Sequence, residues 1–129
     1  KILKSKIEIF STCVRVPVFV GHGESVYIET DKDIDMKKLL SKIKKTSGLS
    51  IVDKKIDGGY VTPDESAGED DVFISRIRQK DKKSMGLWVV ADNLRKGAAL
   101  NSVQIAELLV KKKLIKWKIS KVDILRTIM

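Results

Sequence analysis

Cysteine and histidine are almost missing from this sequence, with one of each among 129 residues. One cysteine cannot form an internal disulfide, and the pair is too small a set for the usual structural zinc sites. We therefore expect no metal site and a reducing, cytoplasmic setting. Aromatic residues are also scarce: two tryptophans, two tyrosines and three phenylalanines. Because none of them alternates with arginine, the sequence lacks the stacking pattern of a single-strand nucleic-acid surface.

Long hydrophobic runs are missing as well. No apolar run has the length of a membrane-spanning helix, and no signal-peptide pattern opens the sequence, so we expect no membrane partner. Charge is unbalanced, with 26 basic against 17 acidic residues and a net charge of +9. Most of the basic residues are lysines, which commonly form a solvated surface. The charge therefore predicts no specific nucleic-acid partner, only salt-sensitive nonspecific binding.

The length suits one domain, and the hydrophobic patterning predicts an α+β fold. We expect a mixed, largely antiparallel sheet with helices packed on one face. Helices are predicted at 36–46, where Asp33 or Asp35 can act as the N-cap, and at 98–112. Strands are predicted at 7–16, 18–20, 24–30, 49–52, 72–78 and 87–91. The first of these is apolar on both faces, so we expect it to be covered on both sides.

The stretch 13–25 holds the only cysteine and the only histidine. His22 lies between two glycines, and it is either a general acid/base or an ordinary turn histidine. Arg15 lies in an apolar run, where a buried guanidinium needs an anionic partner: either Glu24 or a ligand. Cys13 has no base near it in sequence, so we expect a buried, structural cysteine rather than a nucleophile.

A second stretch, 92–99, joins a buried strand to the helix predicted at 98–112. Small residues stand where that helix begins: Gly97, Ala98 and Ala99. Small residues at a helix start either bring backbone N–H groups to an anion or cofactor, or allow close packing. The residues alone leave both interpretations open.

These stretches resemble the C-terminal part of aspartate-β-semialdehyde dehydrogenases. The residues that carry the resemblance are STCVRVPV (11–18), GHGES (21–25), DGGYVTP (57–63), AGED (67–70), VFISRIR (72–78), LWVVADNLRKGAALN (87–101) and QIAE (104–107). They occur in one order over roughly residues 1–112, which is far more specific than any single motif.

The resemblance implies an enzyme that reduces aspartyl phosphate to aspartate semialdehyde with NADPH and releases phosphate. Such enzymes serve lysine synthesis through diaminopimelate, and threonine and methionine synthesis. His22 matches the acid/base histidine of the family, and Arg15 matches the arginine that binds the substrate carboxylate. Asn93, Gly97 and Ala98 match the segment that approaches the nicotinamide end of NADP.

The resemblance also has gaps. The Gly-Asn-Cys motif of the family's nucleophile and its glycine-rich Rossmann segment do not occur among these residues. The resemblance therefore implies an incomplete C-terminal domain of the glyceraldehyde-3-phosphate dehydrogenase-like fold, which would be inactive alone. Residues 1–92 would belong to the substrate-binding and dimerisation domain. Residues 93–113 would pack on a cofactor domain, and 114–129 would be a tail, helical or not.

The apolar face of the helix predicted at 98–112 needs a partner, so we expect a homodimer. The alternative function is a non-catalytic dimerisation or interaction module.

Overall fold

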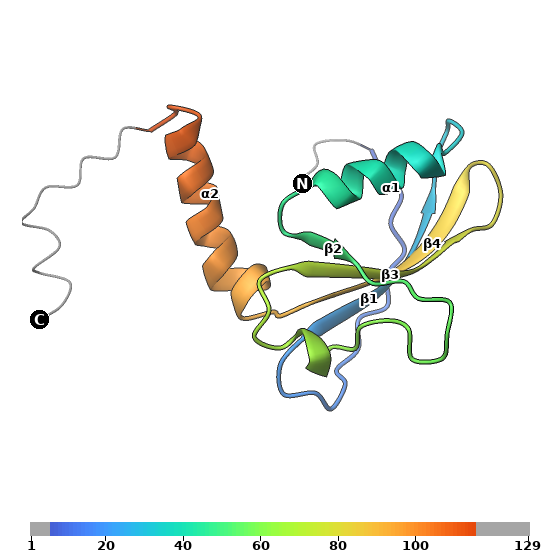
Figure 1. Cartoon of the computed structure of the whole chain (residues 1–129), viewed down its shortest axis with the longest axis horizontal. Coiled ribbons are helices and arrows are strands. Elements are labelled where there is room, and N and C mark those ends of the chain that lie inside the picture. Colours follow the sequence, from blue (N-terminus) through green and yellow to red (C-terminus); the bar gives the residue numbers. More distant parts are fainter. Residues whose placement is uncertain (1–5, 116–129) are drawn as a thin grey trace, which may run out of the picture.

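The computed structural model describes residues 6–115 of the chain. Within them, four strands form one sheet in the order β1-β4-β3-β2 (Figure 1). The strands are β1 (His22–Glu29), β2 (Leu49–Ile51), β3 (Val72–Gln79) and β4 (Ser84–Ala91). The β2–β3 pair is parallel, and the β3–β4 and β4–β1 pairs are antiparallel. The predicted α+β fold with a mixed, largely antiparallel sheet is confirmed.

Helix α1 (Met36–Lys45) lies along β2 (Figure 1). Its N-cap is Asp35, whose side chain accepts a 2.9 Å hydrogen bond from the backbone N–H of Lys38. The apolar side chains that recur at helical spacing are half-buried, and the lysines remain exposed. Three of those lysines lie in the last turn, where a positive charge suits the helix dipole. The predicted helix and one of its two candidate caps are thus confirmed.

Strands β3 and β4 form the predicted hairpin, although β4 begins at Ser84 rather than at residue 87. The register shifts between Ser75 and Arg78, which marks a β-bulge, and Arg76 has the unusual φ of 51°. In the connecting loop, the carboxylate of Asp81 accepts hydrogen bonds from Lys83 N and Ser84 Oγ. These bonds, led by the one from Ser84, lower the pKa of Asp81.

The core of the described residues is small. Its buried apolar side chains are Val61, Ile74, Met85 and Val90. The irregular stretch after β2 returns to the sheet, where Trp88 Nε1 donates to Val61 O at 2.9 Å and Val61 N donates to Ser75 Oγ at 3.4 Å. These bonds fasten the long polar loop over the sheet, and a short 3₁₀ turn follows at Asp64–Ser66.

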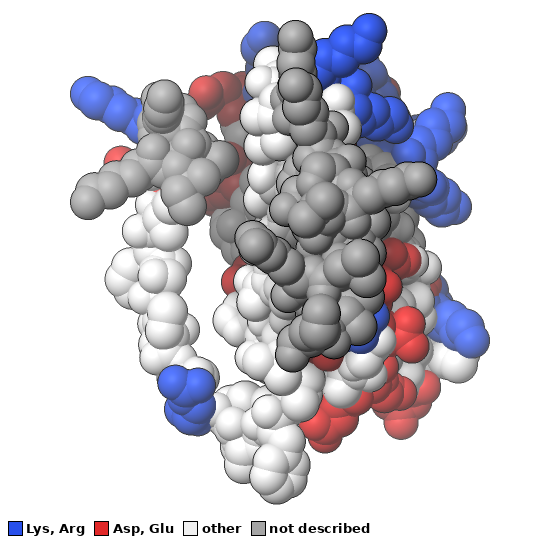
Figure 2. Space-filling view, turned by 90° about the vertical axis from the view of Figure 1, so that its left-hand side faces the viewer, with Lys and Arg blue, Asp and Glu red and all other residues white. Residues whose placement is uncertain are grey.

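The strands predicted at 7–16 and 18–20 are wrong. Residues 6–20 form no strand, and their apolar side chains are largely exposed, with Phe10 at 99%. Figure 2 shows this segment as the column on the left, separated from the rest of the molecule by open space. A strand needs a hydrogen-bonded partner, and none of the other described segments pairs with this one. Cys13 is exposed too, so its predicted burial is also wrong.

After β4 the chain makes a π-helical turn, Arg95–Ala99, and continues as α2 (Leu100–Lys111). The helix predicted at 98–112 is confirmed, but α2 projects away from the sheet (Figure 1), so only α1 packs as predicted. Val103, Ile105 and Leu108 of α2 are each more than half exposed. No helix among the described residues has the length and apolar character to cross a membrane. Of the predicted tail at 114–129, residues 116–129 lie outside the described part.

Candidate functional site

His22 stands at one end of the sheet. It is the first residue of β1, and it pairs with Ala91, the last residue of β4. The imidazole is 64% exposed, and its Nε2 lies 2.9 Å from Glu24 Oε1. Because a carboxylate only accepts hydrogen bonds, Nε2 carries a proton, and Nδ1 of the neutral ring is left as the acceptor. The ring is therefore oriented by Glu24 and open to solvent.

The two glycines beside His22 are required by close packing. Gly21 has φ of +112°, and a Cβ there would lie 2.5 Å from the carbonyl oxygen of Pro63. A Cβ on Gly23 would lie 2.6 Å from the ring of Trp88. Glycine at both positions lets the chain around His22 lie directly against the loop and the sheet. The structure thus gives these glycines a packing role inside the chain.

One hydrogen bond joins the two stretches that the sequence singled out. The backbone N–H of Gly21 donates to Asn93 Oδ1 at 2.8 Å, across 72 positions of sequence. His22 and Asn93 are therefore brought to the same end of the sheet. Because the donor is a backbone N–H, the acceptor must be the amide oxygen of Asn93, which leaves its NH₂ group available to a ligand.

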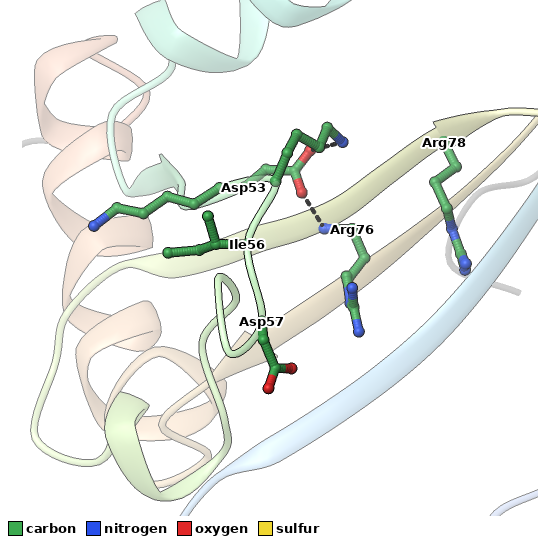
Figure 3. Close-up of a pocket in the computed structure, with 7 residues that line it drawn as sticks. Asp53, Ile56, Asp57, Arg76 and Arg78 are labelled. Atoms are coloured by element: carbon green, nitrogen blue, oxygen red, sulfur yellow. Dashed lines mark hydrogen bonds and ion pairs between the residues drawn. The ribbon is translucent and has the colours of Figure 1, made fainter.

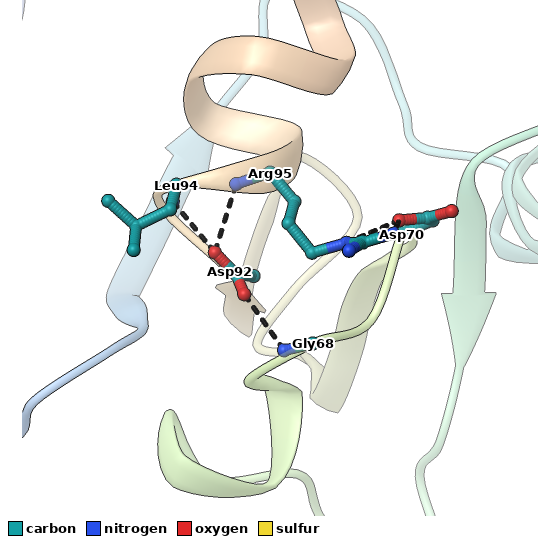
Figure 4. A network of polar contacts seen from close by, with 5 residues as sticks. All are labelled: Gly68, Asp70, Asp92, Leu94 and Arg95. Atoms are coloured by element: carbon teal, nitrogen blue, oxygen red, sulfur yellow. Dashed lines mark hydrogen bonds and ion pairs between the residues drawn. The ribbon is translucent and has the colours of Figure 1, made fainter.

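Asp92, which sequence reasoning did not single out, is 3% exposed and accepts three backbone hydrogen bonds. Its Oδ1 accepts from Leu94 N at 2.7 Å and Arg95 N at 3.0 Å, and its Oδ2 accepts from Gly68 N at 2.8 Å (Figure 4). The bond from Gly68 is the main reason that the pKa of Asp92 is lowered; burial opposes the shift. An Asp placed directly between a buried strand and a helix is a capping pattern, and it could have revealed this residue.

The π-helical turn presents the residues predicted to meet the cofactor. Gly97 N donates to Asp92 O at 3.1 Å, and Ala99 N donates to Leu94 O at the same distance. Such turns occur frequently at functional sites. Gly97 and Ala98 are exposed, and a Cβ on Gly97 would only reach ordinary contact, 3.7 Å from Asn93 Cβ and from Asp92 O. Packing within the described residues therefore does not demand a glycine at Gly97.

Arg15 lies apart from this group. It belongs to the exposed segment 6–20, so the expectation of a buried guanidinium is wrong. Its suggested partner Glu24 contacts His22 instead, and no ion pair joins Arg15 to residues 6–115. Within residues 6–115, no strand pairs with the segment that carries Arg15. The structure therefore brings His22, Asn93 and the π-helical turn together, but not Arg15.

A basic cavity of about 440 Å³ lies beside the β-bulge. Its lining residues are Asp53, Lys54, Lys55, Ile56, Asp57, Arg76 and Arg78 (Figure 3). Asp53 is already engaged, since its carboxylate accepts from Arg76 N at 2.9 Å and from Lys55 Nζ at 3.2 Å. The Arg76 guanidinium stacks over the ring of Tyr60, with 4.7 Å to its centroid. None of the predicted site residues lines this cavity.

Metal ligands are not clustered in the described part of the chain. Residues 6–115 contain no group of three or more His, Cys, Asp or Glu side chains arranged to hold a metal ion.

Comparison with known proteins identifies the family to which the chain belongs. The family model described as "Semialdehyde dehydrogenase, dimerisation domain" matches residues 1–96. The chain belongs to this family. The aspartate-semialdehyde dehydrogenase of Aquifex aeolicus is 47% identical over 112 residues, which are 84% of this chain and 33% of the relative. That of Bacillus subtilis is 46% identical over 115 residues, 84% of this chain and 32% of the relative.

Solved structures of related proteins resemble this chain over the same part of their length. A crystal structure of aspartate semialdehyde dehydrogenase II from Vibrio cholerae, complexed with ASA, superposes with a TM-score of 0.68 and 44% identity. The match covers 78% of this chain and 30% of that one. The chain thus spans about a third of the length of the curated relatives it matches, in their C-terminal part. The glyceraldehyde-3-phosphate dehydrogenase-like fold is confirmed.

Proposed function

We propose that this chain is the C-terminal part of an NADP-dependent aspartate-semialdehyde dehydrogenase. This enzyme is an oxidoreductase that reduces aspartyl phosphate to aspartate semialdehyde and releases phosphate. The observation that carries the proposal is one end of the sheet, where an exposed, oriented His22 is tied through Gly21 to Asn93. Family membership supports it. The proposed setting is cytoplasmic synthesis of lysine through diaminopimelate, and of threonine and methionine.

His22 is the proposed acid/base. Its Nε2–H faces Glu24, and its Nδ1 remains able to accept a proton from a reacting group. An imidazole held in place with one nitrogen carrying a proton and the other free to accept one suits general acid/base chemistry. The thiol nucleophile of the reaction would lie outside these 129 residues, since Cys13 lies on the exposed segment 6–20 and no second cysteine occurs.

The π-helical turn is the proposed contact with the cofactor. NADPH would supply the hydride. Gly97 fits this role because its lack of a side chain has no explanation in the packing of the described residues, while it leaves room for a ligand. Ala98 is exposed beside it, and the Asn93 NH₂ group offers a hydrogen-bond donor.

Arg15 is the proposed partner of the substrate carboxylate, for which a planar guanidinium is the best-matched side chain. Because Arg15 forms no ion pair with residues 6–115, its charge is available to a ligand. The segment that carries it must then be ordered by parts of the protein outside the described residues. The proposed binding of the substrate carboxylate by Arg15 therefore requires the intact protein.

We further propose a homodimer. The family is described as a dimerisation domain, and apolar side chains are exposed on segment 6–20 and on α2. A non-catalytic dimerisation or interaction module is the second candidate function. It is favoured by the match to a family model described as a dimerisation domain.

The test uses the intact protein that carries this sequence. Aspartate semialdehyde, NADP⁺ and phosphate are supplied together, and NADPH formation is followed by its absorbance. We expect turnover that requires all three, and no turnover from the 129 residues alone. Glu29→Gln, an exposed change at the other end of β1, is the control and should leave turnover unchanged. If the intact, folded dimer forms no NADPH, the enzyme proposal is refuted and the module remains.

A further inference from the structure

Two neighbouring residues, Asp92 and Asn93, hold three separate segments together. Asn93 Oδ1 accepts from Gly21 N, so it holds the residue before His22. Asp92 Oδ2 accepts from Gly68 N, so it holds the turn of the long loop. Asp92 Oδ1 accepts from Leu94 and Arg95, so it holds the first residues of the π-helical turn (Figure 4). We call this pair of residues the joint.

The carboxylate of Asp92 is the stronger half of the joint. It is buried and ionised, and hydrogen bonds to a charged acceptor are about twice as strong as neutral ones. Gly68 has φ of +84°, a conformation that glycine adopts readily, and its N–H reaches Asp92 from that turn. The nearby pair between Arg95 and Asp70 lies on the exposed side, where an ion pair contributes little. Asp92 therefore dominates the attachment of the π-helical turn to the loop.

We propose that Asp92 is a positioning residue that holds the π-helical turn and the strand start with His22 in one fixed arrangement. In this proposal Asp92 contacts neither substrate nor cofactor. It affects the reaction only by holding other segments in place. The inference rests on the proposed function, in which Gly97 meets the nucleotide and His22 moves the proton. A displacement of about 1 Å between such groups costs on the order of 100-fold in rate.

The first experiment measures amide hydrogen exchange in the intact protein with Asp92→Asn. An asparagine keeps one acceptor oxygen, so it turns an NH₂ group either toward Gly68 or toward the N–H groups of Leu94 and Arg95. We expect exchange to quicken about tenfold or more at Gly68 and Arg95, and also at Gly21, which Asp92 does not touch. Asp64→Asn, an exposed change in the same loop, should alter none of these amides.

The second experiment separates positioning from simple loss of stability. We expect Asp92→Asn to raise the KM for NADP⁺ about tenfold and to lower kcat. The matched control is Val90→Ala, a fully buried residue on β4 two positions before Asp92, which should lower the unfolding temperature but leave the KM unchanged.

The proposal is overturned if exchange at Gly21 is unchanged, because Asp92 would then be a local helix cap only. It is also overturned if Asp92→Asn behaves as Val90→Ala does in both kinetic constants. Complete lack of turnover in the unsubstituted protein would refute the proposed function instead, and hydrogen exchange would still decide whether the joint exists.

Discussion

The two residues expected to act on substrate, His22 and Arg15, lie in very different surroundings. His22 begins a strand that is paired along its length, next to a glycine that is hydrogen-bonded to Asn93. Arg15 lies in segment 6–20, which stands apart from the rest of the described molecule (Figure 2). Both stretches have the apolar, β-branched composition of strands. The difference shows that strand composition alone does not make a strand, because a strand also needs a hydrogen-bonded partner.

Loss of the imidazole should have the largest effect. In the intact protein, His22→Asn should lower kcat by about 10²- to 10⁴-fold, because proton transfer is lost. The unfolding temperature should stay unchanged, because the side chain is 64% exposed and its one hydrogen bond is to the exposed Glu24. Steady-state kinetics and thermal unfolding check both parts. If the variant keeps the full kcat, His22 is not the acid/base of the reaction.

The two site glycines should respond in opposite ways to alanine. Gly21→Ala should destabilise the protein by about 2–4 kcal/mol, because φ is +112° and the new Cβ would overlap Pro63 O. Gly97→Ala should be neutral or stabilising by up to about 1 kcal/mol, because a Cβ fits there and alanine favours helix. Denaturant unfolding gives both values.

Gly97→Ala also bears on the cofactor. If a nucleotide approaches Gly97 closely, the KM for NADP⁺ should rise several-fold in this stable variant. An unchanged KM would contradict the contact proposed for the π-helical turn.

Acid should weaken the joint that holds His22. The lowered pKa of Asp92 means that the folded state favours its ionised form, through the N–H groups of Gly68, Arg95 and Leu94. Its contribution to stability is therefore present above the ordinary aspartate pKa of about 3.9, and it is lost as pH falls through the lower folded value. The unfolding temperature of the native protein should exceed that of Asp92→Asn by about 5 °C at neutral pH.

That difference should shrink at about pH 3 and below. Asp81 and Glu65, whose pKa values are also lowered, are present in both proteins and cancel in the comparison. If the difference in unfolding temperature between the two proteins does not change with pH, the pKa of Asp92 is not lowered in the folded state.

The smallest effect on stability should come from a substitution in segment 6–20, which carries Arg15. In the 129-residue chain, Phe10→Asp should change the free energy of unfolding by less than about 0.5 kcal/mol, because Phe10 is 99% exposed. In the intact protein, where we expect the segment to be covered, the same change should weaken the dimer, as measured by sedimentation. A large loss of stability in the chain itself would show that the segment packs, and the contrast with His22 would disappear.

Local patterns predicted most of the sheet and both helices. Alternation placed the strand after His22, and the spacing of apolar residues placed α1 with Asp35 at its cap. Residue type and position drew attention to Arg15, His22, Gly97 and Ala98. The resemblance to the family added Asn93 and gave all five their proposed roles. The structure brings four of these five to one end of the sheet, while their roles stay proposals.

The rest depends on contacts between residues far apart in sequence. The sequence shows glycine on both sides of His22, but only the structure shows that Pro63 and Trp88 leave no space for a side chain there. Asp92 was not singled out from the sequence, and its partner Gly68 lies 24 positions away. Residues 7–16 have a strand pattern, but alternation cannot show whether a second strand lies beside them.

The order of pairing in the sheet has a consequence for synthesis of the protein. Of the four described strands, β1 leaves the ribosome earliest, whereas its partner β4 leaves latest, after the long polar loop. The bond between Gly21 and Asn93, 72 positions apart, can form only after that. Such late, long-range closure slows folding. During this interval β1 has no hydrogen-bonded neighbour, so we expect β1 and the apolar segment before it to be prone to aggregation until β4 is made.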